Sequence, residues 1–168
     1  YSSAVVNVSE GATITLPEIP QGQYISMGVI TEDHRIQAMQ YTPGEYTLSS
    51  HQGDFVYVVI RLDSTIPVDR VHDIQDSIKI SANASEPLSA AQVNKAQFDA
   101  VTTQLKAEIP ALMKRDGAKA LYGMFTNPTD DSQQLFTEKK YQVGAAAGWG
   151  GAQVIDNIYE GTANMPDD

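Results

Sequence analysis

Cysteine is absent from the 168 residues, which excludes disulfide bonds, thiolate nucleophiles and thiolate metal ligands. Basic residues are few, because 11 Lys and Arg stand against 21 Asp and Glu, and the formal charge of -10 repels phosphate backbones and anionic lipid surfaces. No apolar run approaches the roughly 20 residues that a membrane-spanning helix needs. We therefore expect no nucleic-acid partner and no membrane span. The scattered acidic residues predict a solvated surface, with calcium binding as the alternative, and we expect no cofactor and no metal site.

Phosphate-binding glycine loops are also lacking, although the stretch GAAAGWGG at residues 144–151 invites the comparison. A Walker loop needs a lysine and a hydroxyl residue after its glycines, and a dinucleotide fingerprint needs a strand before them and a helix after them. Neither context exists here, so we predict that these glycines close a helix. Trp149 within the stretch has two interpretations: a side chain that fills the core, or a flat surface at a ligand site.

The first half of the chain predicts strands, because short β-branched and aromatic runs alternate with turn residues. AVVNV and ATITL flank SEG and predict a hairpin, and QYISMGVIT and RIQAMQY flank the turn EDH. EYTLSS follows the turn TPG, and DFVYVVIRLD follows HQG. The run from Phe55 to Ile60 is the most apolar and predicts a central strand covered on both faces. PVDRVHDIQD has helical spacing and predicts a short helix, after which IKISA could return as a final strand.

The second half predicts helices, because apolar residues recur with a spacing of three to four. The first amphipathic face consists of Val93, Phe98, Val101, Leu105 and Ile109. Pro110 should kink or restart this helix, and Gly117 should stop it. A further helix is expected from an N-cap at Asn127 to about Ala147.

These patterns predict a single α+β domain over residues 1–168. We expect an antiparallel β-sandwich or open barrel over about residues 3–82, within a β part of 1–82. Packed helices over about residues 89–160, within a helical part of 83–160, should cover it, because helices must bury their apolar faces.

The chain resembles a bacterial family, the domain-of-unknown-function family 1254. The landmarks occur in order over about Tyr1 to Gly161: YSSAVVNVSEGATITLPE, SMGVITEDH, PGEYTL, YVVIR, VHDIQDSIKI, AAAGWGG and IDNIYEG. One departure is that Ala152 and Gln153 follow the glycines where the family often has a proline.

The resemblance implies a location and a set of neighbours rather than an activity. Family 1254 is usually the N-terminal domain of exported proteins whose second domain is the unknown-function family 1214. The resemblance therefore implies a periplasmic or otherwise exported location, a β-rich fold with helical additions, and no established activity. It also implies chain before Tyr1 and a second domain after residues 161–168, which would be the inter-domain joint.

Charged residues that could perform chemistry gather in TEDHR, residues 31–35, at the end of a predicted strand. His34 could act as a general base with its tautomer fixed by Asp33, or the segment is a solvated turn with a capping aspartate. SSHQGD around His51 predicts an ordinary turn.

Two further residues elsewhere in the chain invite a functional interpretation. His72 stands four residues before Asp76 on the predicted short helix, so both could reach one metal ion, but we favour an exposed His72 without a metal. Arg61 should find a carboxylate such as Asp63 or Asp76, or else receive an anionic ligand.

The leading hypothesis is an exported binding or assembly module without catalysis, whose partner is a small molecule or the second domain. The alternative is a hydrolase or lyase that uses Asp33 and His34, with Arg61 holding an anionic substrate. The candidate ligand-binding residues are Asp33, His34, Arg61 and Trp149. A homodimer is expected through the face nearest Ile155, Ile158 and Tyr159, unless that stripe closes the protein's own core.

Overall fold

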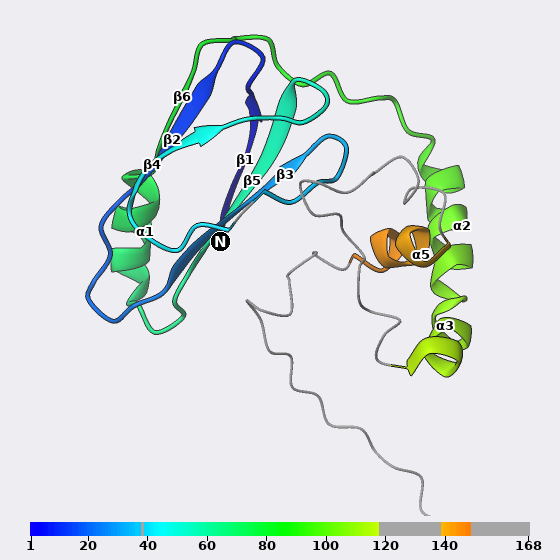
Figure 1. The fold of residues 1–168 in the computed structure, drawn as a ribbon. Coiled ribbons are helices and arrows are strands. Elements are labelled where there is room, and N and C mark those ends of the chain that lie inside the picture. Colours follow the sequence, from blue (N-terminus) through cyan, green and yellow to red (C-terminus); the bar gives the residue numbers. More distant parts are fainter. Residues whose placement is uncertain (38, 118–138, 149–168) are drawn as a thin grey trace, which may run out of the picture.

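The computed structural model describes residues 1–37, 39–117 and 139–148 (Figure 1). Several sequence-based predictions therefore concern residues outside the described ones: Trp149, the N-cap at Asn127, the dimer stripe of Ile155, Ile158 and Tyr159, and the joint at 161–168.

The fold is a mixed α+β fold, as predicted, and its described residues form two three-stranded antiparallel sheets (Figure 1). The first sheet has the order β1 (Ser2–Asn7), β5 (Phe55–Leu62), β3 (Ile25–Thr31). The second has the order β4 (Gly44–Leu48), β2 (Ala12–Leu16), β6 (Lys79–Ala82). Among the described residues, no strand pairing joins the two sheets into a closed barrel.

The predicted hairpin between the first two strands is wrong. The turn itself exists, with Gly11 at a φ of 91° and its N–H donating to the Val8 carbonyl over 3.0 Å. However, β1 pairs with β5, whereas β2 pairs with β4 and β6. The turn therefore moves the chain from one sheet to the other, because both strands bury apolar side chains in the core between the sheets.

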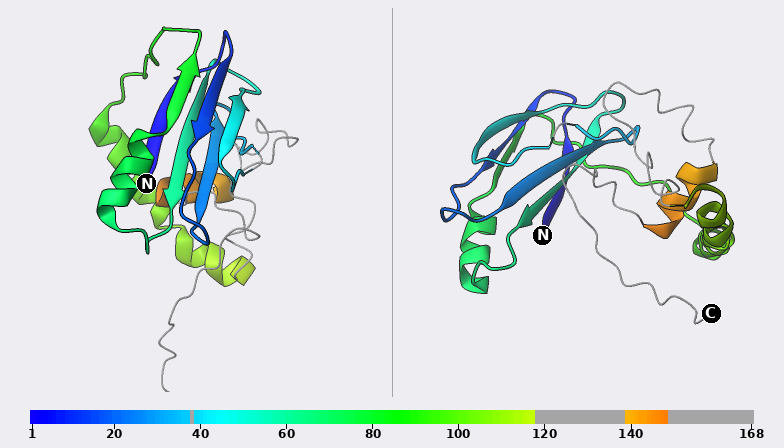
Figure 2. Two further views of the ribbon diagram at one scale, coloured as in Figure 1. Left: turned by 90° about the vertical axis from the view of Figure 1, so that its left-hand side faces the viewer. Right: turned by 60° about the horizontal axis from the view of Figure 1, so that its bottom comes forward.

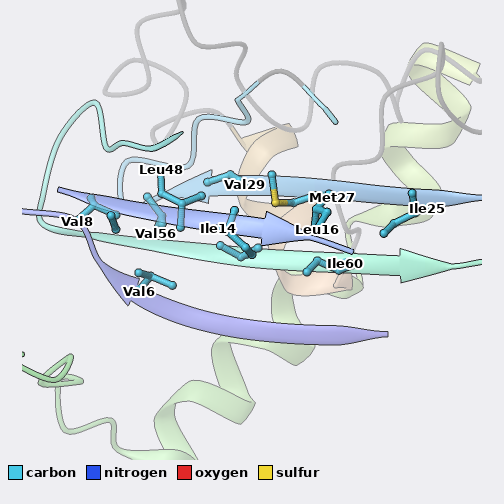
Figure 3. Close-up of a cluster of buried hydrophobic side chains, with 12 residues drawn as sticks. Val6, Val8, Ile14, Leu16, Ile25, Met27, Val29, Leu48, Val56 and Ile60 are labelled. Carbon is cyan, nitrogen blue, oxygen red and sulfur yellow. The ribbon is translucent and has the colours of Figure 1, made fainter. Parts of the chain in front are cut away.

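One apolar core lies between the two sheets (Figure 3). It is built from alternating positions, as the period of two in a strand requires. Its buried members are Val6, Val8, Ala12, Ile14, Leu16, Ile25, Met27, Val29, Leu48, Val56, Val58 and Ile60.

Strand β5 is central in its sheet, as predicted, but it is not covered on both faces. Its inward residues Val56, Val58 and Ile60 are buried, whereas Tyr57 on the opposite face is 44% exposed. The apolar run therefore has one buried face and one partly exposed face. An apolar run in the sequence does not distinguish a strand covered on one face from a strand covered on both.

The short helix is confirmed as α1 (Val68–Asp76), which buries Ile74. The predicted return strand is β6, which pairs antiparallel with β2. The segment after the EDH turn runs back beside β3 through isolated bridges at Ile36 and Gln40 rather than as a full strand.

In residues 83–117 and 139–148 the structure has three further helices: α2 (Lys95–Lys106), α3 (Ile109–Asp116) and α5 (Lys139–Ala147). Pro110 restarts the helix in the first turn of α3, as predicted, and Gly117 ends it with a φ of 57°. Gly148 follows α5 with a φ of 74°, so this glycine ends the helix as predicted.

These helices pack on one another to one side of the sheets instead of covering them (Figures 1 and 2). Their small core consists of Leu112 and Val143, with Leu105 and Ile109 packed against it. The rest of the predicted amphipathic face does not share in this core, since Val93, Phe98 and Val101 are 64%, 59% and 50% exposed. Within the described ranges, no helix has both the length and the apolar character that crossing a membrane requires.

Candidate functional site

The TEDHR segment forms the hairpin turn that the sequence predicts. The Thr31 N–H donates to the Arg35 carbonyl over 2.9 Å, and the His34 N–H donates to the Thr31 carbonyl over 2.9 Å. His34 has a φ of 58°, the left-handed conformation that often closes a three-residue hairpin loop. The turn thus gives Asp33 and His34, which are neighbours in sequence, separate surroundings.

Asp33 lies at the centre of a buried polar cluster, with a side chain that is only 4% exposed. Its Oδ1 accepts from the Thr31 hydroxyl at 2.5 Å, and its Oδ2 accepts from Arg35 Nε at 2.8 Å and from His51 Nδ1 at 2.9 Å. Burial by itself would raise the pKa of Asp33. The hydrogen bonds from Thr31, His51 and Arg35, together with the charge of Arg35, outweigh burial and hold this pKa below its ordinary value.

His51 is the residue of this cluster that sequence reasoning missed. It was expected to lie in an ordinary turn, but it donates from Nδ1 to Asp33, which leaves Nε2 as the remaining ring nitrogen of a side chain that is 55% exposed. Because 18 residues separate the pair, only the folded arrangement of the two loops brings them together.

The loop that carries His51 is docked on the turn through Glu32. The N–H groups of Asp54 and Phe55 donate to Glu32 Oε2 over 2.7 Å and 3.3 Å. Gly53 has a φ of 82°, and a Cβ at this position would overlap the Glu32 carboxylate. A glycine is therefore required here both for its backbone conformation and for the close approach of Glu32.

His34 contacts the helical part of the chain through Tyr141. Its Nδ1 is hydrogen-bonded to the hydroxyl of Tyr141 on α5, and the two rings are tilted by 50° with centroids 5.8 Å apart. Burial lowers the pKa of His34, and the nearby Asp33 charge offsets part of that shift. Burial also raises the pKa of Tyr141 to about 12. His34 thus connects the sheets to α5.

Arg61 lies at the other end of the same sheet. It pairs with Ser26 in the register of β5 and β3, and its Cζ is 5.6 Å from the centroid of the Tyr1 ring. Asp63, one of the carboxylates expected for Arg61, accepts from the N–H and hydroxyl of Thr65 over 2.9 Å and 2.8 Å.

The positions along β3 show how the candidate residues are distributed. Ser26 and Thr31 are five residues apart, which is roughly 16 Å at about 3.3 Å per residue. Asp33 and His34 follow Thr31, whereas Arg61 lies opposite Ser26. The structure therefore brings Asp33 together with His51 and Arg35, and places Arg61 outside this cluster.

His72 and Asp76 are both exposed on α1. In the part of the chain that the structure describes, no group of three or more His, Asp or Glu side chains is placed to hold a metal ion.

Neither a family model nor a curated protein matches the sequence. Among solved structures, the chain is similar to the crystal structure of the VPA0106 protein from Vibrio parahaemolyticus, with a TM-score of 0.45 and 12% sequence identity. The match covers 87% of this chain and 46% of that one, so this chain spans about half the length of its structural neighbour.

Proposed function

We propose that this chain is a binding or assembly module without catalysis. The observation that supports this function is that Asp33 and His34 form hydrogen bonds with different partners. Asp33 accepts from Thr31, Arg35 and His51, and the Nδ1 of His34 is hydrogen-bonded to Tyr141. In the predicted catalytic pair Asp33 would orient the ring of His34, whereas the described side-chain hydrogen bonds of Asp33 orient His51 and Arg35. The two residues instead hold the turn together and connect it to α5.

The resemblance to family 1254 supports a role of the same kind. We propose that the chain is an exported bacterial domain of this family, periplasmic in location, which works beside a second domain. Its acidic surface, with a formal charge of -10, suits a soluble module whose partners are neither nucleic acid nor anionic lipid.

Catalytic assays with substitutions test this function. The purified chain, His34→Ala and the control His72→Ala would be assayed with p-nitrophenyl acetate and p-nitrophenyl phosphate, with folding checked by circular dichroism. We expect no turnover that depends on His34. Turnover in the unsubstituted chain that His34→Ala abolishes, with the fold and His72→Ala unaffected, would contradict a non-catalytic module.

A second candidate is a hydrolase or lyase in which His51, not His34, is the base. The observation that favours it is the 2.9 Å hydrogen bond from His51 Nδ1 to the buried Asp33, which fixes the tautomer and leaves Nε2 on a half-exposed ring. In this version Arg61 does not hold the substrate, because it lies in β5 opposite Ser26, at the other end of the sheet from Asp33. Loss of p-nitrophenyl acetate turnover in His51→Ala but not in His72→Ala would support this candidate over the binding module.

A further inference from the structure

We infer that the outer edge of β1 is a self-association surface, at which two copies of this chain pair strand to strand into a two-fold dimer. The surface, called here the β1 edge, consists of the backbone N–H and C=O groups of Ser3, Val5 and Asn7. The inference goes beyond the proposed function, because it holds for an enzyme as well, and its experiments measure association rather than turnover. It concerns a different surface from the dimer stripe at residues 155–159, which lies outside the described residues.

The hydrogen bonds of the first sheet show which backbone groups of β1 point outward. β1 is an edge strand that pairs antiparallel with β5. In the continuation of this register, the Val8 N–H donates to the Asp54 carbonyl over 2.7 Å. Every second residue of an antiparallel strand bonds to the same neighbour, so the even-numbered residues of β1 face β5. The N–H and C=O groups of Ser3, Val5 and Asn7 therefore point away from β5.

The opposite edge of the same sheet is already covered. Beyond β3, Met27 and Gln40 exchange backbone hydrogen bonds of 2.8 Å and 3.0 Å, and the Thr31 N–H donates to the Arg35 carbonyl over 2.9 Å. At the β1 edge, by contrast, the described residues supply no hydrogen-bond partner for the outward backbone groups. The first sheet can therefore gain a strand beside β1 but not beside β3.

The sequence of β1 lacks the features that natural edge strands use against pairing. Such strands carry charged residues, proline or bulges, because unpaired backbone groups attract other strands. The edge strands of the second sheet each carry a charge, Glu45 in β4 and Lys79 in β6. β1 has the sequence SSAVVN, without a charge or a proline, and Val5 on its outer face is 51% exposed. Of these three edge strands, β1 is thus the one whose side chains oppose pairing least.

Two side-chain contacts mark the ends of the open stretch. Gln75 Nε2 at the end of α1 donates to the Tyr1 carbonyl, and Asn7 Nδ2 donates to the Glu86 carbonyl, both over 3.1 Å. Residues 3–7 lie between these contacts, and this is about the usual length of a strand.

A second copy of β1 fits this stretch. In an antiparallel pair centred on Val5, the two Val5 residues exchange hydrogen bonds and Ser3 of each copy pairs with Asn7 of the other, which gives about six backbone hydrogen bonds. Both strands are neutral, so they meet without like charges although the whole chain carries a formal charge of -10. The pairing also stops at two copies, because it uses β1 of both and the far edge of β3 is covered.

The side chains on the outer face of the sheet favour the same register. Val5 is paired with Tyr57, and Tyr57 with Ile30, so the three form an apolar row across the sheet. Pairing centred on Val5 brings two such rows end to end. Cross-strand contacts between β-branched and aromatic side chains stabilise a sheet, so the extended row adds to the backbone hydrogen bonds.

Cysteine cross-linking tests this register directly, because the chain has no cysteine of its own. Opposite residues of a hydrogen-bonded antiparallel pair have Cα atoms about 5.5 Å apart, which suits a disulfide. Val5→Cys should therefore form a disulfide-linked dimer under mild oxidation. The matched control is Tyr57→Cys on the same face, where the natural side chain is 44% exposed. Its two copies would be three strand spacings apart, about 14 Å, and should not cross-link.

Sedimentation equilibrium of the full chain tests association without a cross-link. We expect a dimer, and Val5→Pro should weaken it about 10-fold or more, since proline removes the outward N–H of both copies but no bond to β5. Val5→Thr keeps this N–H and the β-branched shape, so it should dimerise like the unsubstituted chain. Circular dichroism checks that both variants keep the fold, and the cross-linking pair decides if Val5→Pro unfolds.

Three outcomes would overturn the inference. The first is a chain that stays monomeric at all concentrations, which would leave the β1 edge to a strand of another protein. The second is a folded Val5→Pro chain that dimerises as tightly as the unsubstituted one. The third is a Tyr57→Cys chain that cross-links as readily as Val5→Cys.

Discussion

Replacing Asp33 by Asn should destabilise the protein more than any exposed charge replacement, because this carboxylate satisfies three donors in a buried cluster. Asn has the same shape but offers one acceptor oxygen, and its amide N–H groups would face Arg35 or His51. Breaking a buried ion pair from one side costs about 3–5 kcal/mol, and Asn recovers part of this. Since the side chains of Asp33 and Arg35 are only 4% and 10% exposed, solvent screens this pair little. We therefore expect a loss of about 3 kcal/mol.

The control for this prediction is Asp73→Asn, which makes the same chemical change in an exposed ion pair. Asp73 accepts from Arg70 over 3.1 Å, and their side chains are 66% and 63% exposed, so the expected loss is below about 1 kcal/mol. Urea unfolding followed by circular dichroism measures both losses. A loss of about 3 kcal/mol corresponds to a thermal midpoint lower by roughly 6–12 °C for a chain of this length. Equal losses in Asp33→Asn and Asp73→Asn would refute the buried cluster.

The free energy of unfolding at acid pH gives a second test of the Asp33 carboxylate. The pKa of Asp33 in the folded state is lowered, so its contribution is fully present above the unfolded value near 3.9 and is lost as the pH falls through the folded pKa. The stability difference between the unsubstituted chain and Asp33→Asn should therefore narrow as the pH falls from 5 to 2. A difference that stays constant would contradict the lowered pKa.

Two further predictions concern the contacts on either side of the Asp33 cluster. Tyr141→Phe removes the hydroxyl that binds His34 and should lower the free energy of unfolding in urea by about 1 kcal/mol. Because the pKa of Tyr141 in the folded state is raised to about 12, the unsubstituted chain should also lose stability as the pH rises from about 10 to 12. The same loss of stability over this pH range in Tyr141→Phe would contradict this. Gly53→Ala should cost more than Gly22→Ala, since the two glycines have φ of 82° and 81° but only Gly53 lies against Glu32, and equal losses in thermal unfolding would show that this contact is unimportant.

Local chemistry made several elements predictable from the sequence. The EDH turn follows from residues that tolerate sharp reversal, and the left-handed His34 closes it. Pro110 restarts a helix because it lacks an N–H, and Gly148 ends one because it has no Cβ. The period of two in β2, whose inward residues are all buried, also follows from its own sequence.

Pairing partners were not predictable in the same way. The hairpin between β1 and β2 failed because a turn fixes only the direction of the chain, whereas the burial of two apolar faces decides which strands are neighbours. The exposure of Phe98 and Val101 was missed for a related reason, since helical spacing identifies an apolar face but not what covers it.

The sequence by itself determined the α+β class, the EDH turn, the helix boundaries at Pro110, Gly117 and Gly148, and the presence of reactive side chains in residues 31–35. Only the tertiary structure decided which of them meet, since Asp33 pairs with His51 rather than His34, and Arg61 lies with Ser26 at the far end of the sheet. The physical reason is range: turn and helix signals act over a few residues, whereas a side-chain contact depends on how distant strands pack around a shared core.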